Sequence, residues 1–222
     1  MKNFSSLYKD EYFDNRNQND LQRQVSFFQE KEFIEKYTSL EAIVCDVGCS
    51  TGEFLSTIGW KGEKYGMEIN ATAVEKAIAS GINFDKNILT EKNFFNVVIF
   101  RGTIQHLPDP FGYISSAYNA LKPGGVIFFL ATPNANSLVY KIFNTLPALS
   151  PKFNFYIPSD ITLNNILKNF DFEVIDTQYP YIKSPYAQPI ADHINFIKSI
   201  IIKLEPRFAF WKNMMNIIAR KP

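Results

Sequence analysis

Residues 42–54 read AIVCDVGCSTGEF, and this stretch decides the fold that the sequence predicts. A buried-type apolar run passes through Asp46 into a turn that contains Gly48 and Gly52, and a helix is expected from Glu53. Glycines in such a turn let the backbone approach a ligand closely. Parallel sheets bind ligands outside the carboxyl ends of their strands, so this turn is the first candidate site.

Apolar runs alternate with helical segments along the chain. Strands are predicted at 42–48, 64–69, 82–84, 96–100, 126–131, 172–177 and 210–219, and helices at 53–58, 71–79, 110–121, 159–169 and 190–204. This alternation implies right-handed crossovers and parallel pairing. We therefore predict an α/β, Rossmann-like sheet of seven mostly parallel strands with helices on both faces.

The length of 222 residues suits one domain, 1–222, with a sizeable core. Residues 1–40 are expected to form an N-terminal helical cap. The apolar positions of this cap recur at roughly helical spacing: Leu21, Val25, Phe28 and Phe33. Residues 134–158 and 180–209 break the strand–helix rhythm, and we expect these two insertions to form the acceptor side of a site.

The charge balance argues against nucleic acid as a partner. The 23 basic residues nearly cancel the 22 acidic ones, whereas nucleic-acid sites carry a clear Lys/Arg field. The motif Asn-Pro-Pro-Tyr, typical of amino methylation of bases, does not follow the fourth predicted strand. The partner is therefore expected to be a small-molecule acceptor.

The two cysteines indicate a reducing compartment. Cys45 and Cys49 lie four residues apart in one segment, and this spacing does not suit a disulfide framework. Two cysteines are also too few ligands for a zinc site. The N-terminus has no signal-peptide core, and the apolar stretch 194–204 is short and carries Lys198 and Lys203. We expect a cytoplasmic protein with no membrane span and no bound metal.

The turn also discriminates between cofactors. Glu68 ends the second predicted strand, 22 residues after Asp46, where an acidic group can accept hydrogen bonds from a ribose diol. A dinucleotide fingerprint would have glycines where Ser50 and Glu53 stand, and Glu53 would repel a diphosphate. An ammonium and a sulfonium tolerate that carboxylate, so S-adenosylmethionine is favoured over a nicotinamide cofactor. An oxidoreductase stays as a third option.

Four segments in order resemble the class I S-adenosylmethionine-dependent methyltransferases. They are DVGCSTGEF at 46–54, Glu68, VVIFRGTIQHLPDP at 97–110 and LKPGG at 121–125, so the resemblance covers roughly residues 40–133. The ending NMMNIIAR at 213–220 is similar to the antiparallel last strand of that family.

The resemblance implies roles for the matching residues. Asp46 and Gly48 would hold the methionine end of the cofactor, and Glu68 would bind the ribose. The other implied cofactor-binding residues are Cys49 and Gly52 in the same loop, Ile69 against the adenine, Asp85 or Asn87 near the adenine amino group, and Arg101 and Gly102 beside the methyl group. Tyr12 would be a lid residue or an aromatic that packs the cap.

Methyl transfer is an in-line substitution in which the protein positions the acceptor and removes its proton. His106, after the fourth strand, is the catalytic candidate as a general base, and it could instead order its loop. His193 is expected at the surface or at a helix end. The remaining candidates have a structural alternative as turn, cap or loop-packing residues: Asp109, Asp160, Asn134, Asn136 and Tyr156.

The acceptor is less well specified. The insertions are rich in Phe, Tyr, Pro and Asn, which suits a small polar acceptor with flat faces. The segment YIKSPYA at 181–187 resembles family members near glycan biosynthesis, so O-methylation of a sugar or glycan-linked group is expected, with a quinone precursor as the alternative. A non-catalytic S-adenosylmethionine-binding partner is the other alternative, because the apolar stretch 190–204 could be a homodimer or partner face.

Overall fold

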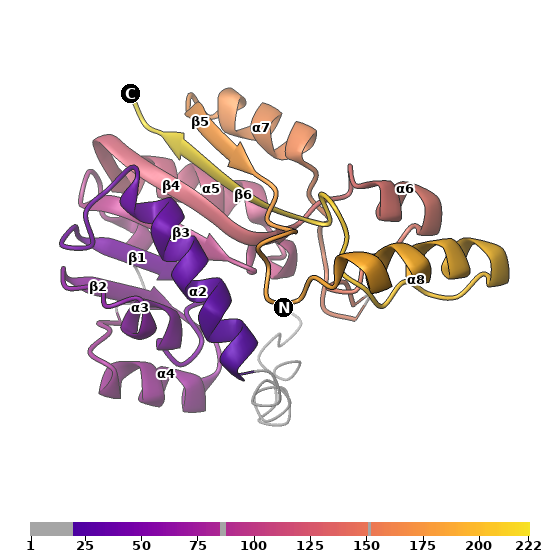
Figure 1. Ribbon diagram of the computed structural model, residues 1–222. Helices are drawn as coiled ribbons and strands as arrows, with labels where there is room; N and C mark the ends of the chain where they lie inside the picture. Colours follow the sequence, from indigo (N-terminus) through magenta and orange to yellow (C-terminus); the bar gives the residue numbers. More distant parts are fainter. Residues whose placement is uncertain (1–19, 85–87, 151) are drawn as a thin grey trace.

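The computed structural model describes residues 20–84, 88–150 and 152–222, and one six-stranded sheet organises them (Figure 1). The strands are β1 (Val44–Val47), β2 (Lys64–Met67), β3 (Phe95–Arg101), β4 (Leu121–Pro133), β5 (Glu173–Gln178) and β6 (Met214–Arg220). Their order is β2-β1-β3-β4-β6-β5, with β1 to β4 parallel and β6 antiparallel to both of its neighbours. The predicted α/β class, the mostly parallel sheet and the antiparallel last strand are confirmed.

Helices lie on both faces of this sheet. They are α2 (Asp20–Glu35), α3 (Glu53–Thr57), α4 (Ala71–Ala79), α5 (Pro110–Ala120), α6 (Leu138–Phe143), α7 (Asp160–Asn169) and α8 (Pro189–Ile202), with the short 3-10 turns η3 (Ile88–Thr90) and η4 (Ile104–His106). Side-chain caps fix several starts: Asp109 accepts from the Gly112 amide at 2.9 Å, and Ser159 forms a capping box with Thr162.

The central strand β3 explains the two-sided core. Val97 and Ile99 pack toward α2, α3 and α4, whereas Val98 and Phe100 pack toward α5 and α7. All four side chains are fully buried. Because side chains alternate across a strand, a continuous apolar run is what a strand covered on both faces requires.

Two strand predictions need correction. The segment 82–84 forms only an isolated bridge between Asn83 and Tyr65, so the sheet has six strands and not seven among the described residues. Asn83 forms two backbone hydrogen bonds with β2, which is too little pairing for a strand at this outer edge of the sheet. The last strand begins at Met214 and not at residue 210, because Phe210 is buried under α8 and Lys212 takes a left-handed turn (φ 62°) first.

The apolar positions that recur at helical spacing in α2 are only partly buried. Phe33 is buried, but Leu21, Val25 and Phe28 are exposed. The buried face of the helix instead includes Glu30, whose carboxylate forms an ion pair with Arg101. Because charged Glu30 lies on the inward side of α2, the spacing of apolar residues alone does not identify the buried side of this helix.

The two insertions lie together at one end of the sheet, where α6 and α8 project from the body (Figure 1). Val139, Leu146, Phe208 and Phe210 form a small separate core there, and Phe196 of α8 packs against it. The helix predicted at 190–204 is α8, whereas the six-residue α6 was not predicted. Within the described ranges, no helix is long and apolar enough to cross a membrane.

A candidate cofactor site at the carboxyl ends of the strands

The turn after β1 depends on Gly48 and Gly52. Both are left-handed, with φ of 78° and 76°. A Cβ atom at Gly48 would lie 2.5 Å from Cγ2 of Thr103, and one at Gly52 would lie 2.7 Å from Cδ1 of Ile82. Neither position has room for a side chain, so glycine lets the backbone of the turn pack closely against Thr103 and Ile82.

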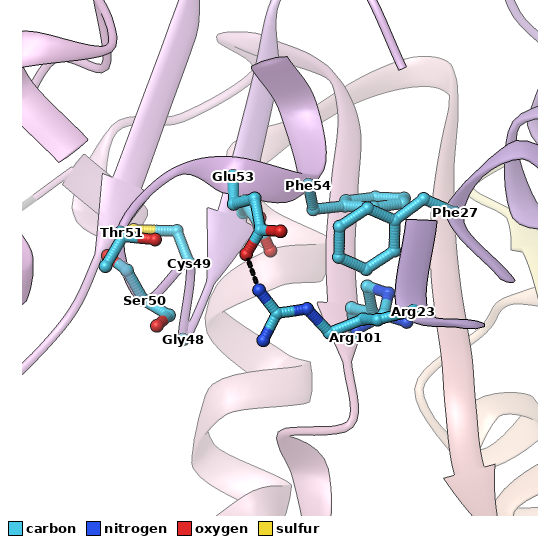
Figure 2. Close-up of a pocket in the computed structure, with 10 residues that line it drawn as sticks. Arg23, Phe27, Gly48, Cys49, Ser50, Thr51, Glu53, Phe54 and Arg101 are labelled. Atoms are coloured by element: carbon cyan, nitrogen blue, oxygen red, sulfur yellow. Dashed lines mark hydrogen bonds and ion pairs between the residues drawn. The ribbon is translucent and has the colours of Figure 1, made fainter. Parts of the chain in front are cut away.

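A pocket opens between this turn and α2 (Figure 2). Its lining residues are Arg23, Phe27, Asp46, Gly48, Cys49, Ser50, Thr51, Glu53, Phe54 and Arg101. Of the candidates from the sequence, the pocket brings together Asp46, Gly48, Cys49 and Arg101. It lies beyond the carboxyl ends of β1 and β3, where ligands of parallel sheets bind.

Asp46 is the most unusual group in the pocket. Its side chain is buried, and its Oδ1 atom has no hydrogen-bond partner among the described residues. Burial raises the pKa of Asp46 to about 7, with Glu68 and Glu30 adding to the effect and Arg101 opposing it. A buried carboxylate without a partner is costly, so this site favours a ligand that brings a positive charge.

Glu68 lies just after β2 and is oriented by three backbone amides. Its Oε2 atom accepts from the Ser50 amide at 3.1 Å, and its Oε1 atom accepts from Ile69 at 2.7 Å and Asn70 at 3.0 Å. A carboxylate has about four acceptor positions, so about one remains for a ligand hydroxyl. Ile69 is 54% exposed beside it and offers an apolar surface for a flat ring.

Helix α2 closes the pocket through two ion pairs. Arg23 pairs with Glu53, as the dashed line in Figure 2 marks. Arg101 donates from Nε to Oε2 of Glu30 at 2.5 Å, and its guanidinium lies 4.3 Å from the ring centre of Phe27. Arg101 therefore lines the pocket as predicted, but its charge is committed to α2.

Phe27 and Phe54 supply the apolar wall of the pocket, with ring centroids 5.2 Å apart. Sequence reasoning missed these two rings and Arg23. Phe54 stood in the quoted motif without an assigned role. For Arg23 and Phe27 the only signal was the helical spacing of residues 21–33, which does not show which side of the helix faces the pocket.

The other predicted cofactor residues differ in burial and in which of their atoms are available to a ligand. Cys49 is buried with its thiol against Gly66, and burial raises its pKa, so the protein offers its backbone and not a thiolate to the pocket. Gly102 is left-handed (φ 59°) and donates its amide to the Leu130 carbonyl at 2.8 Å. Tyr12, Asp85 and Asn87 lie outside the described residues. Both Cys45 and Cys49 are free thiols, as predicted.

His106 ends η4 and ties this turn to the first insertion. Its Nδ1 atom lies 2.9 Å from the Phe153 carbonyl oxygen, and its Nε2 atom lies 3.4 Å from the Gln105 amide nitrogen. Since a carbonyl only accepts, Nδ1 carries the proton and Nε2 the lone pair. His106 stands outside the set of described residues that line the pocket.

The remaining candidates form structural contacts. Asp160 accepts from the Asn136 amide at 2.8 Å and from the Tyr179 hydroxyl at 2.5 Å; these bonds, against the cost of burial, leave its pKa lowered. Asn134 is buried, and its Oδ1 accepts from the Asp160 amide at 3.1 Å. Exposed His193 lies 2.6 Å from the Pro189 carbonyl through Nδ1, which fits the predicted surface position.

The fold and the pocket define a class of protein: a Rossmann-like domain with an acidic residue at the carboxyl end of each of its first two strands, Asp46 and Glu68, and a pocket beside the first. A model of the methyltransferase domain family matches residues 14–177. The chain therefore belongs to this methyltransferase family.

Individual relatives are more distant. A ubiquinone biosynthesis O-methyltransferase from Pseudomonas savastanoi pv. phaseolicola is 28% identical over 139 residues, covering 53% of this chain and 60% of that protein. A structure titled as a possible histamine N-methyltransferase from Thermotoga maritima has a TM-score of 0.65 at 16% identity, with 99% and 98% of the two chains covered. Magnesium protoporphyrin IX methyltransferase from Synechocystis PCC 6803, solved with bound S-adenosylhomocysteine, has a TM-score of 0.60 at 15% identity, covering 91% and 84%.

The cofactor of this family is S-adenosylmethionine, and the described residues fit it. The unpartnered Oδ1 of Asp46 suits an ammonium group, and Gly48 lines the same pocket without a side chain. The carboxylate of Glu68 retains about one acceptor position for a ribose hydroxyl.

Proposed function

We propose that this chain transfers the methyl group of S-adenosylmethionine to a hydroxyl group of a small acceptor. The observation that carries the proposal is Asp46, a buried carboxylate with an unpartnered oxygen beside a glycine turn that tolerates no side chain. Bound there, the cofactor would supply an electrophilic methyl group. The residues of the chain bind and orient it, and Phe27 of α2 with Phe54 of α3 excludes water from one side.

The first insertion supports an acceptor position beyond the end of β3. The amides of Phe155 and Tyr156 both donate to the Gln105 carbonyl, at 2.9 and 3.3 Å. Tyr156 also lies near the exposed ring of Phe111, with centroids 6.1 Å apart. In the proposed single domain 1–222, residues 134–158 and 180–209 provide the acceptor side, and these aromatic rings suit an acceptor with a flat face.

His106 is the proposed general base. The hydrogen bond from Nδ1 to the Phe153 carbonyl orders the loop and leaves the lone pair on Nε2, where it faces the Gln105 amide nitrogen at 3.4 Å. As a base, His106 would exchange this contact for the acceptor hydroxyl. A base of this kind takes a proton more readily from a phenol, with a pKa of about 10, than from an aliphatic alcohol.

We favour a phenolic hydroxyl of a quinone precursor as the acceptor over a sugar. The name of the Pseudomonas relative supports a ring hydroxyl, and the aromatic rings beside η4 suit one. A sugar or glycan-linked group is the second candidate, supported by the resemblance of residues 181–187. The matched part of the chain spans about 60% of the Pseudomonas relative, so both the phenol and the sugar are proposed acceptors.

The test is a methyl-transfer assay with labelled S-adenosylmethionine and two acceptor panels. One panel holds catechol-type phenols such as protocatechuic acid, and the other holds free hexoses and nucleotide sugars. We expect label in a phenol, and label only in a sugar would replace the acceptor class. Cofactor binding without transfer to either panel would favour the non-catalytic binding protein, and binding of NAD alone would favour an oxidoreductase.

A further inference from the structure

Helix α8 carries apolar side chains on the side that faces away from the molecule. Ile190, Ile194, Ile197 and Ile201 recur at intervals of four, three and four residues, which places them on one side of a helix. Their exposed fractions range from 47% to 82%. These four residues are called the α8 apolar face below, and exposed Ile200 and Leu204 lie at its margin.

The opposite side of α8 docks on the protein through both polar residues and Phe196. Asp192 and Ser199 are buried there, and Asp192 accepts from the Tyr181 hydroxyl at 3.1 Å and from the Gln188 amide at 2.8 Å. The ring of Phe196 stacks on Phe210 at 4.7 Å. These contacts fix the rotation of the helix, so the α8 apolar face cannot turn inward without breaking them.

Figure 1 shows the consequence of this docking: α8 projects from the end of the sheet, beside α6, and most of its length lies beyond the body of the domain. An amphipathic helix normally turns its apolar side to the core. In α8 the docked side carries Phe196 together with buried Asp192 and Ser199, and four isoleucines lie outside. A contiguous apolar surface of this kind marks an interaction site.

We propose that the α8 apolar face pairs with the same face of a second copy of this chain, so that two α8 helices lie side by side across a twofold axis. Alternating intervals of four and three residues are those of a helix–helix seam, and β-branched isoleucine packs well in such seams. With its margin, the face presents six branched aliphatic side chains that are 46% to 82% exposed, which is apolar area of the kind that a stable interface buries at about 800 Å² per partner.

The charges favour a protein partner over a lipid surface. Helices that lie on membranes carry many lysines and arginines, whereas Lys198 is the sole lysine or arginine within α8. A twofold interface also requires a surface that is complementary to itself. An uncharged row of isoleucines meets that requirement, and a formal net charge of +1 per chain gives two copies little mutual repulsion.

The experiment measures the mass of the full chain by size exclusion with light scattering and by sedimentation velocity at micromolar concentrations. The wild-type chain should run at about 51 kDa, twice the chain mass of 25.5 kDa. The double variant Ile194→Asp/Ile197→Asp should run as a monomer. The matched control is Ile78→Asp, because Ile78 is 55% exposed on α4, away from this face, and this variant should stay dimeric.

A wild-type monomer across this concentration range overturns the proposal, and so does a dimer that survives the double variant. Flotation with anionic vesicles separates the rival partner: a monomeric chain that floats would assign the face to lipid and reject the dimer. Circular dichroism of the variant confirms that it is folded, and a second double variant, Ile190→Asp/Ile201→Asp, provides an independent test at the two ends of the face. None of these readouts requires cofactor or activity.

Discussion

The affinity for S-adenosylmethionine should fall as the pH drops below 7, because Asp46 must be ionised to hold the ammonium group. Burial raises the pKa of Asp46 to about 7 in the protein without cofactor. A bound ammonium next to its unpartnered Oδ1 stabilises the charged form and lowers that pKa. The cofactor therefore binds the ionised form, and the binding energy is lost as the pH falls through the pKa of the free protein.

The magnitude follows from the ionised fraction of one carboxyl group. With a pKa of about 7, Asp46 is about half ionised at pH 7 and about one-tenth ionised at pH 6, so affinity should drop about fivefold across that unit. From pH 6 to pH 5 the drop should approach tenfold. Below pH 7 the cofactor amine stays largely protonated, since α-amino groups titrate near 8, so the ligand itself contributes little.

The assay is isothermal titration at pH 5, 6 and 7, with thermal unfolding at each pH to confirm that the protein is folded. Asp46→Asn is the control, and it should bind at least about tenfold more weakly at pH 7 with a much flatter pH profile. An equally steep profile in Asp46→Asn, or a flat profile in the wild-type protein, would refute the link between burial, pKa and cofactor charge.

Three further variants test the site. Glu68→Ala should weaken cofactor binding by at least about tenfold, because hydrogen bonds to a charged carboxylate disappear; unchanged affinity in a titration would remove Glu68 from the ribose site. Gly48→Ala should lower stability by about 1–2 kcal/mol or more from left-handed strain and a clash, and should abolish binding. Gly59→Ala shares the left-handed strain but meets open space, so it should lose less stability and keep the cofactor, and equal behaviour in thermal unfolding would reject the close-approach argument. His106→Ala should cut turnover at least about tenfold while cofactor affinity stays nearly constant; His193→Ala should leave turnover unchanged, and lost cofactor binding in His106→Ala would indicate a purely structural role.

The sequence predicts the fold well where a local pattern determines it. The strand, glycine turn and helix at 44–57 depend on neighbouring residues, as does the cap at Ser159 that starts α7. Parallel strands buried on both faces leave a strong apolar signal, which is why 96–100 identified the centre of the sheet.

The failures come from contacts between distant residues. Arg23 and Glu30 face inward because Glu53 and Arg101 neutralise them, and no pattern within α2 shows those partners. Phe27 was missed as a pocket wall for the same reason. Asp46 was assigned from the motif, but its unpartnered oxygen and raised pKa depend on burial that only the assembled sheet creates.

The most direct test of the central claim is isothermal titration of the wild-type chain at pH 7 with S-adenosylmethionine and S-adenosylhomocysteine, and with NAD as the control. The account predicts binding of the first two ligands with micromolar dissociation constants and no heat from NAD. Absence of binding for both sulfur-containing ligands would mean that the turn at 46–52 is not a working cofactor site, and it would contradict the methyltransferase function proposed for this chain.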